Sequence, residues 1–341
     1  MRTLMNSSEK PKRRRRYRGK NPRHFSEKYK ERAPERYAED VARIVARGRT
    51  PAGMHLSVLV SEVMEILSPQ PGELAVDCTL GYGGHAVEFL RRIQPGGRLI
   101  GIDVDPVELP KTEARLRASG FGPDTFTAHR TNFAGLAGVL PQPADLIFAD
   151  LGLSSMQIDD PERGFTYKYD GPLDLRMNPH RGEPASALLA HIGQDELARL
   201  LSENADEPDA DRLARVILQA GPTRTTQLAN VIRTEGDEDT IRRVFQALRI
   251  AVNDEFGAVD ALLRSLPFCL KPGGRVAIIT FHSGEDRRVK KAFQAGERTG
   301  QYSEIAREVT RAGAEEIRAN PRSRSAKLRW ARCSENRQEK T

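Results

Sequence analysis

The chain has 341 residues, of which 38% are hydrophobic and 30% are charged. This length can hold two domains, or one domain with a large insertion, and the composition is typical of a globular protein. No apolar stretch approaches the roughly 20 residues that a membrane helix requires, and no apolar segment typical of a secretion signal follows the first charges. The three cysteines stand singly, which argues against structural zinc and disulfides. We therefore expect a cytoplasmic protein without a membrane partner.

The net charge of +7 is unevenly distributed along the chain. Residues 1–50 carry 17 Lys and Arg against 6 Asp and Glu, whereas the other 291 residues carry 37 against 41. The most basic stretch, residues 10–20, has little apolar surface to bury, and we expect a partly disordered arm followed by a short helix. Clustered arginines favour contact with nucleic-acid phosphates. The alternative is a solvated tail that only keeps the protein soluble.

After the arm, the pattern predicts a short helix over residues 63–67 and then alternating strands and helices from about residue 73 to 150. Residues 126–133 predict one strand of this segment and its exit loop. This alternation is typical of a parallel sheet with crossover helices. Three other apolar runs each carry an acid at or near the carboxyl end: 75–77 with Asp77, 98–105 with Asp103, and 144–150 with Asp150.

A glycine-rich turn follows the first of these strands and reads Gly81-Tyr-Gly83-Gly84-His85. An acid at the end of the second strand, here Asp103, typically accepts the hydroxyl groups of a ribose. The turn has no lysine that would bind phosphate, so the pattern favours an adenosyl cofactor without phosphates, and S-adenosylmethionine fits that description. A dinucleotide, or no cofactor at all, remains an alternative, although the glycine spacing departs from Gly-x-Gly-x-x-Gly.

The strand pattern stops after Asp150, and residues 157–245 predict helices without a strand. An insertion behind the carboxyl end of a sheet strand lies beside the ligand crevice, which favours a substrate-recognition lid over a purely stabilising bundle. The strand pattern resumes at residues 274–281 and again at 326–332. We therefore predict a sheet domain made of residues 51–156 and 246–341, interrupted by a helical insertion at 157–245.

Ten stretches between residue 54 and about residue 332 resemble the bacterial small-subunit ribosomal RNA cytosine-N4 methyltransferases, the MraW/RsmH family. The most specific are Asp-Asp-Pro-Glu-Arg-Gly-Phe at 159–165 and Asp-Gly-Pro-Leu-Asp-Leu-Arg-Met at 170–177. The resemblance implies an α/β class I S-adenosylmethionine-dependent methyltransferase, with a Rossmann-like doubly wound sheet and an inserted helical domain. It also implies methylation of the N4 amino group of one specific cytosine in 16S ribosomal RNA of the small subunit.

The same resemblance implies positions that contact the S-adenosylmethionine cofactor. The glycine turn would line its methionine and ribose side, Asp103 would accept from the ribose, and an aromatic ring would pack on the adenine. No metal site is expected, because the histidines and acids lack ligand spacing. The implied cofactor residues are Gly83, Gly84, His85, Asp103, Phe133, Asp150 and Gln157.

The segment Asp150-Leu-Gly-Leu-Ser154-Ser155 stands where many amino-methyltransferases have Asp/Asn-Pro-Pro followed by an aromatic residue. The exocyclic amine of cytosine is a poor nucleophile because its lone pair is delocalised into the ring, so an acceptor must bind the amine hydrogens. Our hypothesis is that Asp150, or a backbone carbonyl beside it, is this acceptor, and that Ser154 or Ser155 orients the base. The alternative for Asp150 is a purely cofactor-binding role.

A methylated base must be single-stranded or flipped out, and aromatic faces commonly hold such a base. Phe165, Tyr167 and Phe281 are the aromatic candidates, although each could equally belong to a core. Four arginines are candidate partners of RNA phosphates, with structural salt bridges as the alternative: Arg163, Arg176, Arg249 and Arg287.

The expected partner is 16S ribosomal RNA within the small subunit, and the sequence leaves a homodimer open. Two departures from the family pattern stand out, namely Gly284 in place of a leucine and the segment 204–209. Two other classes of function compete with the methyltransferase. They are an NAD-dependent oxidoreductase, which the glycine spacing disfavours, and a non-catalytic RNA-binding assembly factor, which the intact cofactor positions disfavour.

Overall fold

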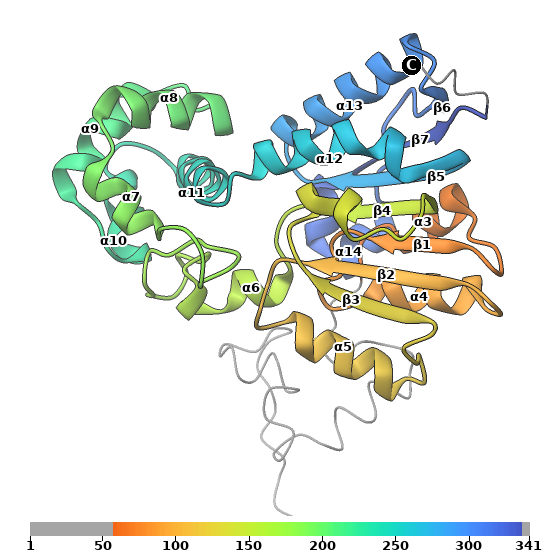
Figure 1. Cartoon of the computed structure of the whole chain (residues 1–341). Coiled ribbons are helices and arrows are strands. Elements are labelled where there is room, and N and C mark those ends of the chain that lie inside the picture. Colours follow the sequence, from red (N-terminus) through yellow and green to blue (C-terminus); the bar gives the residue numbers. More distant parts are fainter. Residues whose placement is uncertain (1–56, 336–341) are drawn as a thin grey trace, which may run out of the picture. The chain divides into compact units, whose positions relative to one another are not determined.

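The computed structural model describes residues 57–335, so the basic arm and its predicted helix lie outside the described residues. A seven-stranded sheet with the order β3-β2-β1-β4-β5-β7-β6 is its centre (Figure 1). Strands β1 to β5 pair in parallel, whereas β7 is antiparallel to β5 and β6 is antiparallel to β7. The predicted doubly wound α/β sheet is thereby confirmed. Its strands are β1 Leu74–Asp77, β2 Arg98–Asp103, β3 Phe126–Arg130, β4 Ala144–Asp150, β5 Leu270–Thr280, β6 Tyr302–Ile305 and β7 Lys327–Cys333.

Two details of the sheet escaped the sequence analysis. Strand β6 has four residues and pairs only with β7 among the described strands, so it offers too short a pattern to recognise. Strand β5 starts at Leu270, before the predicted strand at 274–281, and residues 271–274 form an irregularity in it, because Ala144 pairs with Leu270 and Leu146 already pairs with Arg275.

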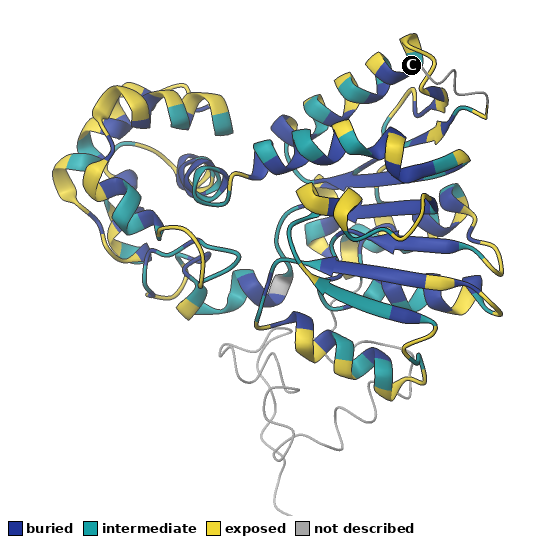
Figure 2. Ribbon diagram, viewed as in Figure 1, coloured by how far each residue is buried: buried dark blue, intermediate teal, exposed yellow. Residues whose placement is uncertain are grey.

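Helices cover both faces of the sheet, and Figure 2 shows the strands buried between them. Helix α4 shows why these segments pack as they do, since Ala86, Phe89, Leu90 and Ile93 are buried at the spacing of one helix face. Each fully buried side chain of this size contributes about 1.5–3 kcal/mol. One face packs against α3 Val60–Leu67, α4 Gly84–Ile93 and α5 Leu109–Ala118; the other packs against α12 Glu255–Cys269 and α13 Ser283–Arg298.

The insertion is helical, as predicted, and has a hydrophobic core of its own. Its last helix runs through the predicted boundary at 245/246, and residues up to Leu248 belong to the core of the insertion. The helical segment therefore ends at Asn253. Among residues 57–335, no helix combines the length and the apolar character needed to cross a membrane. The helices of the insertion are α7 Ala185–His191, α8 Gln194–Ala205, α9 Ala210–Ala220, α10 Thr225–Arg233 and α11 Glu238–Asn253.

The segment 204–209, which departs from the family pattern, connects the insertion to α13. Asp206 ends α8 in the left-handed conformation, with φ at 52°. Its carboxylate accepts hydrogen bonds from Ser283 Oγ at 3.0 Å and from Arg287 Nη2 at 3.0 and 3.1 Å. In the same segment, the Asn204 side chain donates to the carbonyl of Ala247 in α11. Residues of this segment thus hold α8 against α11 and α13.

Gly284 also has a physical explanation in the packing. A Cβ atom at this position would lie 2.5 Å from Cζ of Phe256, much closer than a carbon–carbon contact allows. The Phe256 ring lies 3.6 Å from the guanidinium carbon of Arg288 and 5.8 Å from the ring of His282. Phe256 therefore fills the space that a leucine side chain at position 284 would need.

We predict that Gly284→Leu lowers the free energy of unfolding by about 1–3 kcal/mol, because the new side chain overpacks against Phe256. Adding Phe256→Ala should recover part of this loss, so the double variant should be more stable than the sum of the single effects implies. Denaturant unfolding of the four proteins measures this coupling. Gly138→Leu, at a glycine whose Cβ would meet no atom within 4 Å, is the matched control. Additive single effects would contradict the explanation.

Candidate active site

Several acids gather at the carboxyl edge of the sheet. Strands β1, β2 and β4 end at Asp77, Asp103 and Asp150, and Glu285 lies in the first turn of α13, just after β5. Strand β1 pairs with β2 on one side and β4 on the other, so the chain reverses its direction of winding here. In open α/β sheets, ligands bind in the crevice at such a switch point. The edge is therefore the candidate site.

The glycine turn is attached to the end of β2. The Gly81 N–H donates to Asp103 Oδ2 at 2.7 Å, and the Asp105 N–H donates to Oδ1 at 2.8 Å. Gly83 precedes α4 with φ at 84°, a conformation that glycine adopts without steric cost. A carboxylate has about four acceptor positions, so Asp103 can still accept from a ligand. Burial, partly opposed by these hydrogen bonds, raises the pKa of Asp103 to about 6.

His85 is buried next to Asp150 and is neutral at neutral pH. Its Nε2 lies 2.9 Å from the carbonyl oxygen of Val58, which places the ring proton on Nε2. Nδ1 faces Asp150 Oδ2 at 4.0 Å, and the ring packs against Phe148 with 4.5 Å between ring centroids. Burial lowers the pKa of His85 to about 4. The ring therefore brings no positive charge to the acids around it at neutral pH.

Asp150 carries an unsatisfied oxygen atom. Its backbone N–H donates to Thr79 Oγ1 at 2.6 Å, but the buried Oδ1 has no hydrogen-bond partner among the described residues. Burial raises the pKa of Asp150 to about 8, and the charges of Asp77 and Glu285 act in the same direction. The sequence hypothesis needs Asp150 as a carboxylate that accepts from an amine. In the ligand-free protein at neutral pH, this group instead holds its proton for most of the time.

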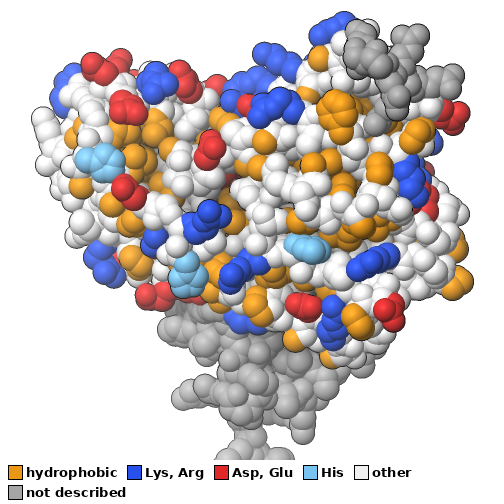
Figure 3. All heavy atoms as spheres, in the orientation of Figure 1, with side chains coloured by type: hydrophobic (Ala, Val, Ile, Leu, Met, Phe, Trp, Pro, Cys, Tyr) orange, Lys and Arg blue, Asp and Glu red, His pale blue; other side chains and the backbone are white. Residues whose placement is uncertain are grey.

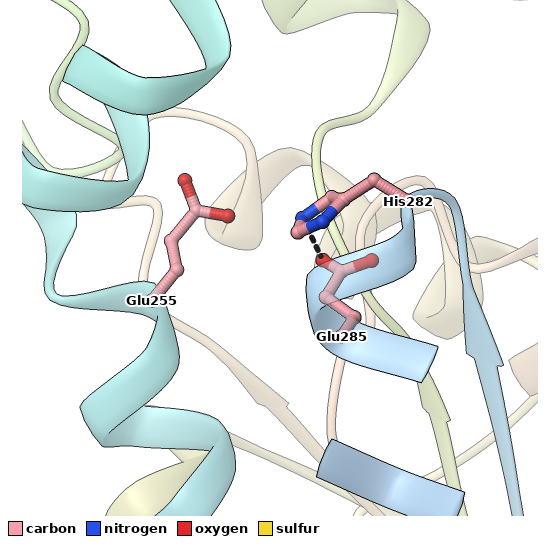
Figure 4. A group of neighbouring side chains, drawn as sticks. All are labelled: Glu255, His282 and Glu285. Atoms are coloured by element: carbon pink, nitrogen blue, oxygen red, sulfur yellow. Dashed lines mark ion pairs between the residues drawn. The ribbon is translucent and has the colours of Figure 1, made fainter. Parts of the chain in front are cut away.

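Glu255, His282 and Glu285 point toward one another beside this edge (Figure 4). Their ligand atoms lie within 4.8 Å of one another, so they form a group that could hold a metal ion, which the sequence analysis did not expect. However, Arg249 donates to both oxygens of Glu255 at 2.7 and 2.9 Å. The Phe281 N–H donates to one oxygen of Glu285, and His282 Nε2 lies 3.2 Å from the other. A metal ion would have to displace the guanidinium group.

This network keeps Glu285 ionised. Burial alone would raise the pKa of Glu285, but the contacts from His282, Phe281 and Arg249 outweigh it, and the pKa is lowered. Asp77 behaves in the opposite way, because its burial, together with the charge of Asp103, raises its pKa to about 7. The edge therefore contains an ionised acid, Glu285, and three acids, Asp77, Asp103 and Asp150, whose pKa values are raised to about 7, 6 and 8.

Ser154 and Gln157 form the first turn of the short helix α6, Ser155–Asp159. The Gln157 N–H donates to Ser154 Oγ at 3.3 Å, and the Ser154 N–H donates to Gln157 Oε1 at 2.9 Å, which is a capping box. The Ser154 hydroxyl thus accepts a backbone bond and keeps its own proton to donate. The side chain of Ser155 lies outside the described residues.

Asp105 is a buried acid beside the site that the sequence analysis did not single out. It is 1% exposed, and its Oδ2 accepts from Gln157 Nε2 at 2.8 Å and from Arg163 Nη1 at 2.9 Å. The predicted cofactor residue Gln157 is therefore held by an acid two positions after Asp103. The only signal in the sequence is this second acid in the stretch 101–106. It joins the end of β2 to the first residues of the insertion.

The predicted aromatic residues have different environments. Phe133 begins the 3-10 helix η2, Phe133–Gly138, and is half-buried against the core beneath α12. Phe165 and Tyr167 pack in or against the core of the insertion, where Tyr167 lies 5.2 Å from the Phe245 ring. Phe281 is half-buried, and Cδ2 of its ring would lie 3.8 Å from a Cβ at Gly152. Phe281 thus lies beside Gly152 in the loop that follows Asp150.

All four arginines named as candidate phosphate partners have acidic partners in the structure. Each pair joins two parts of the fold or stiffens a loop, which is the salt-bridge alternative stated above. The pairs are Arg163 with Asp105, Arg176 with Asp174, Arg249 with Glu255, and Arg287 with Asp206.

These residues fit an adenosyl sulfonium ligand. The edge has more acids than cations, His85 is neutral, and Oδ1 of Asp150 lacks a partner. A positively charged ligand would favour the ionised form of a buried acid. Asp103 retains acceptor positions for hydroxyl groups beside the glycine turn.

Comparison with known proteins places the chain in a family. The model of the MraW methylase family matches residues 52–334. The chain is 48% identical to "Ribosomal RNA small subunit methyltransferase H 2" of Alkaliphilus metalliredigens, over 96% of this chain and 99% of the relative. It is 47% identical to "Ribosomal RNA small subunit methyltransferase H 1" of Lachnoclostridium phytofermentans, over 94% and 92%.

The basic arm has counterparts in some of these relatives. A match that covers 96% of this chain must include most of residues 1–50, which the resemblance noted in the sequence did not cover. By contrast, the match to "Ribosomal RNA small subunit methyltransferase H" of Myxococcus xanthus, at 41% identity, covers 81% of this chain and 96% of the relative. From the family match and these identities, we conclude that the chain belongs to the MraW methylase family.

Proposed function

We propose that this protein transfers the methyl group of S-adenosylmethionine to the N4 amine of a cytosine in 16S ribosomal RNA of the small subunit. Membership of the MraW methylase family supports the reaction class. The observation that carries the proposal is the unpartnered oxygen of Asp150 at an acid-rich sheet edge, beside the glycine turn. An NAD-dependent oxidoreductase and a non-catalytic assembly factor are disfavoured by the same family membership.

The residues proposed to hold the cofactor lie along this edge. Asp103 is proposed to accept from the ribose hydroxyls, and Phe133 to pack on the adenine. Gly83, Gly84 and His85 are proposed to line the methionine side. The bound cofactor would supply an electrophilic methyl group on a positively charged sulfur. Asp150 and Gln157 are proposed to close this site.

Asp150 is proposed to accept the amine hydrogens through Oδ1. A cationic ligand nearby favours its carboxylate form, which can then bind an N–H of the cytosine amine. This contact draws electron density onto the nitrogen, so that its lone pair can leave conjugation with the ring. The nitrogen loses a proton after methylation, and a carboxylate whose pKa lies near 8 in the free protein is well matched to receive it. Ser154 keeps its hydroxyl proton available to orient the base.

We also propose separate roles for the sheet domain, the helical insertion and the basic arm. The sheet domain would bind the cofactor, and the helical insertion would recognise RNA beside the crevice. The basic arm would add contacts to RNA phosphates. A cytoplasmic location is the one that a ribosomal RNA substrate requires in a bacterium. The sequence leaves a homodimer open.

We predict that Asp150→Asn lowers turnover at saturating cofactor by about 100-fold or more, the usual effect of losing a proton acceptor. Cofactor affinity, measured by calorimetry at pH 6, where Asp150 of the parent protein is mostly protonated, should remain close to that of the parent protein. Asp124→Asn, which changes an exposed carboxylate with no ion pair among the described residues, is the matched control. If the variant binds the cofactor more weakly but reaches full turnover at saturating cofactor, Asp150 only binds the cofactor and does not accept from the amine.

The pKa of Asp150 predicts a difference between two ligands. S-adenosylmethionine is a sulfonium cation and favours the carboxylate, so its affinity should rise from pH 6 to about 8 and then level off, by at most tenfold per pH unit. S-adenosylhomocysteine is a neutral thioether there, and its affinity should change less. Calorimetry across pH measures both ligands. A similar slope for both, or a difference that persists in Asp150→Asn, would contradict this role.

We predict that removing residues 1–24 weakens binding to small ribosomal subunits that lack the modification, and reduces the dependence of affinity on salt. Each lost phosphate contact should lower the slope of log affinity against log salt by about 1. Filter binding at several salt concentrations measures both quantities, and cofactor affinity is the control for folding. An arm without a role in binding would leave affinity and slope unchanged.

A further inference from the structure

A pocket of about 470 Å³ opens between the sheet and a loop of the insertion. It lies beside the proposed cofactor site, since two of its lining residues follow Asp103 and another precedes Phe133. Arg130 comes from the end of β3, and His180 and Arg181 come from the loop before α7. No acid lines it. The complete lining is Val104, Pro106, Arg130, Thr131, Asn132, Asn178, His180 and Arg181.

The two arginines of this pocket have no acidic partner among the described residues, unlike Arg163, Arg176, Arg249 and Arg287. Neither the Arg130 nor the Arg181 side chain has an ion pair or hydrogen bond with any residue between 57 and 335. Two guanidinium groups with no acid among the lining residues repel each other and attract an anion, and the His180 ring can add a hydrogen bond. Figure 3 shows Lys, Arg and His side chains close together on this face, where the ends of β2 and β3 meet the insertion.

The loop that carries Arg181 is held in place from both sides. The Arg181 N–H donates to the Asn178 carbonyl at 3.2 Å, and the His180 N–H donates to Asn178 Oδ1 at 3.0 Å. Arg163 donates to the carbonyl of Met177 at 2.7 Å, and Arg176 donates to the carbonyl of Gly182 at 3.0 Å. Arg163 and Arg176 thus fix the loop. The Arg181 side chain, which has no partner between residues 57 and 335, is available to bind a ligand.

We propose that this pocket binds a phosphodiester group of the RNA strand, next to the nucleotide that is methylated. The inference rests on the proposed function, because RNA must cross this rim to present a base to the adjoining edge. Guanidinium groups suit such a ligand, since each donates two parallel hydrogen bonds to phosphate oxygens. Arg130 and Arg181 come from opposite sides of the crevice, so a bound phosphate also ties the insertion to the sheet.

The test is the double variant Arg130→Gln/Arg181→Gln, with the full chain and two measurements. The first is the affinity for a short single-stranded RNA oligonucleotide at several salt concentrations. We expect at least a tenfold loss at low salt and a slope smaller by about 1 for each phosphate contact removed. The second is calorimetric binding of S-adenosylmethionine, which should not change. Arg298→Gln, an exposed arginine with no ion pair within residues 57–335, is the matched control.

Arg130→Lys/Arg181→Lys keeps the charge and loses the paired hydrogen bonds, so it should lie between the parent and the glutamine variant. Unchanged RNA affinity and slope in the glutamine variant would overturn the proposal. A loss of S-adenosylmethionine affinity would also overturn it, because the pocket would then belong to the cofactor. RNA binding is measured without turnover, so a protein that binds RNA through these arginines yet transfers no methyl group would refute only the proposed reaction.

Discussion

The candidate site depends on several buried acids at one edge of the sheet, where the neighbouring cations are too few to neutralise them. Parallel strands bring Asp77, Asp103 and Asp150 together because their carboxyl ends meet there. Burial and mutual repulsion then raise the pKa of Asp77 to about 7 and that of Asp150 to about 8. Such an arrangement costs stability in the free protein, and a cationic ligand relieves that cost. In the proposed reaction, the same imbalance would favour a positively charged ligand at the edge and would prepare Asp150 to receive a proton.

The parts around this edge are fixed by ion pairs and caps rather than by further apolar packing. Asp105 joins Gln157 and Arg163 to the end of β2, and Asp206 joins the insertion to α13. Because the insertion has a separate hydrophobic core, these polar contacts do much to set its position against the sheet. Because these arginines already have acidic partners, Arg130 and Arg181, which have none among the described residues, are the better candidates for RNA contact.

The fold was largely predictable because its elements carry strong local signals. Apolar runs ending in acids identified the main strands, and amphipathic periods identified the helices of the insertion. Strand β6 was missed because four residues carry too weak a pattern, and the boundary near residue 245 fell inside α11 because its apolar period continues to Leu248. The three glycines after the first strand also indicated the turn. Their spacing alone did not identify the cofactor, which only the longer family motifs indicated.

The sequence by itself determined the α/β alternation, the insertion, and the residue types at the strand ends, since all of these follow from local pattern. Only the tertiary structure decided which charges are paired. Residues as distant in the chain as Asp105 and Arg163 become partners through folding, whereas Arg130 and Arg181 are left without any among the described residues. Protonation was decided in the same way, because the pKa of Asp150 depends on burial and on neighbours that come from other strands.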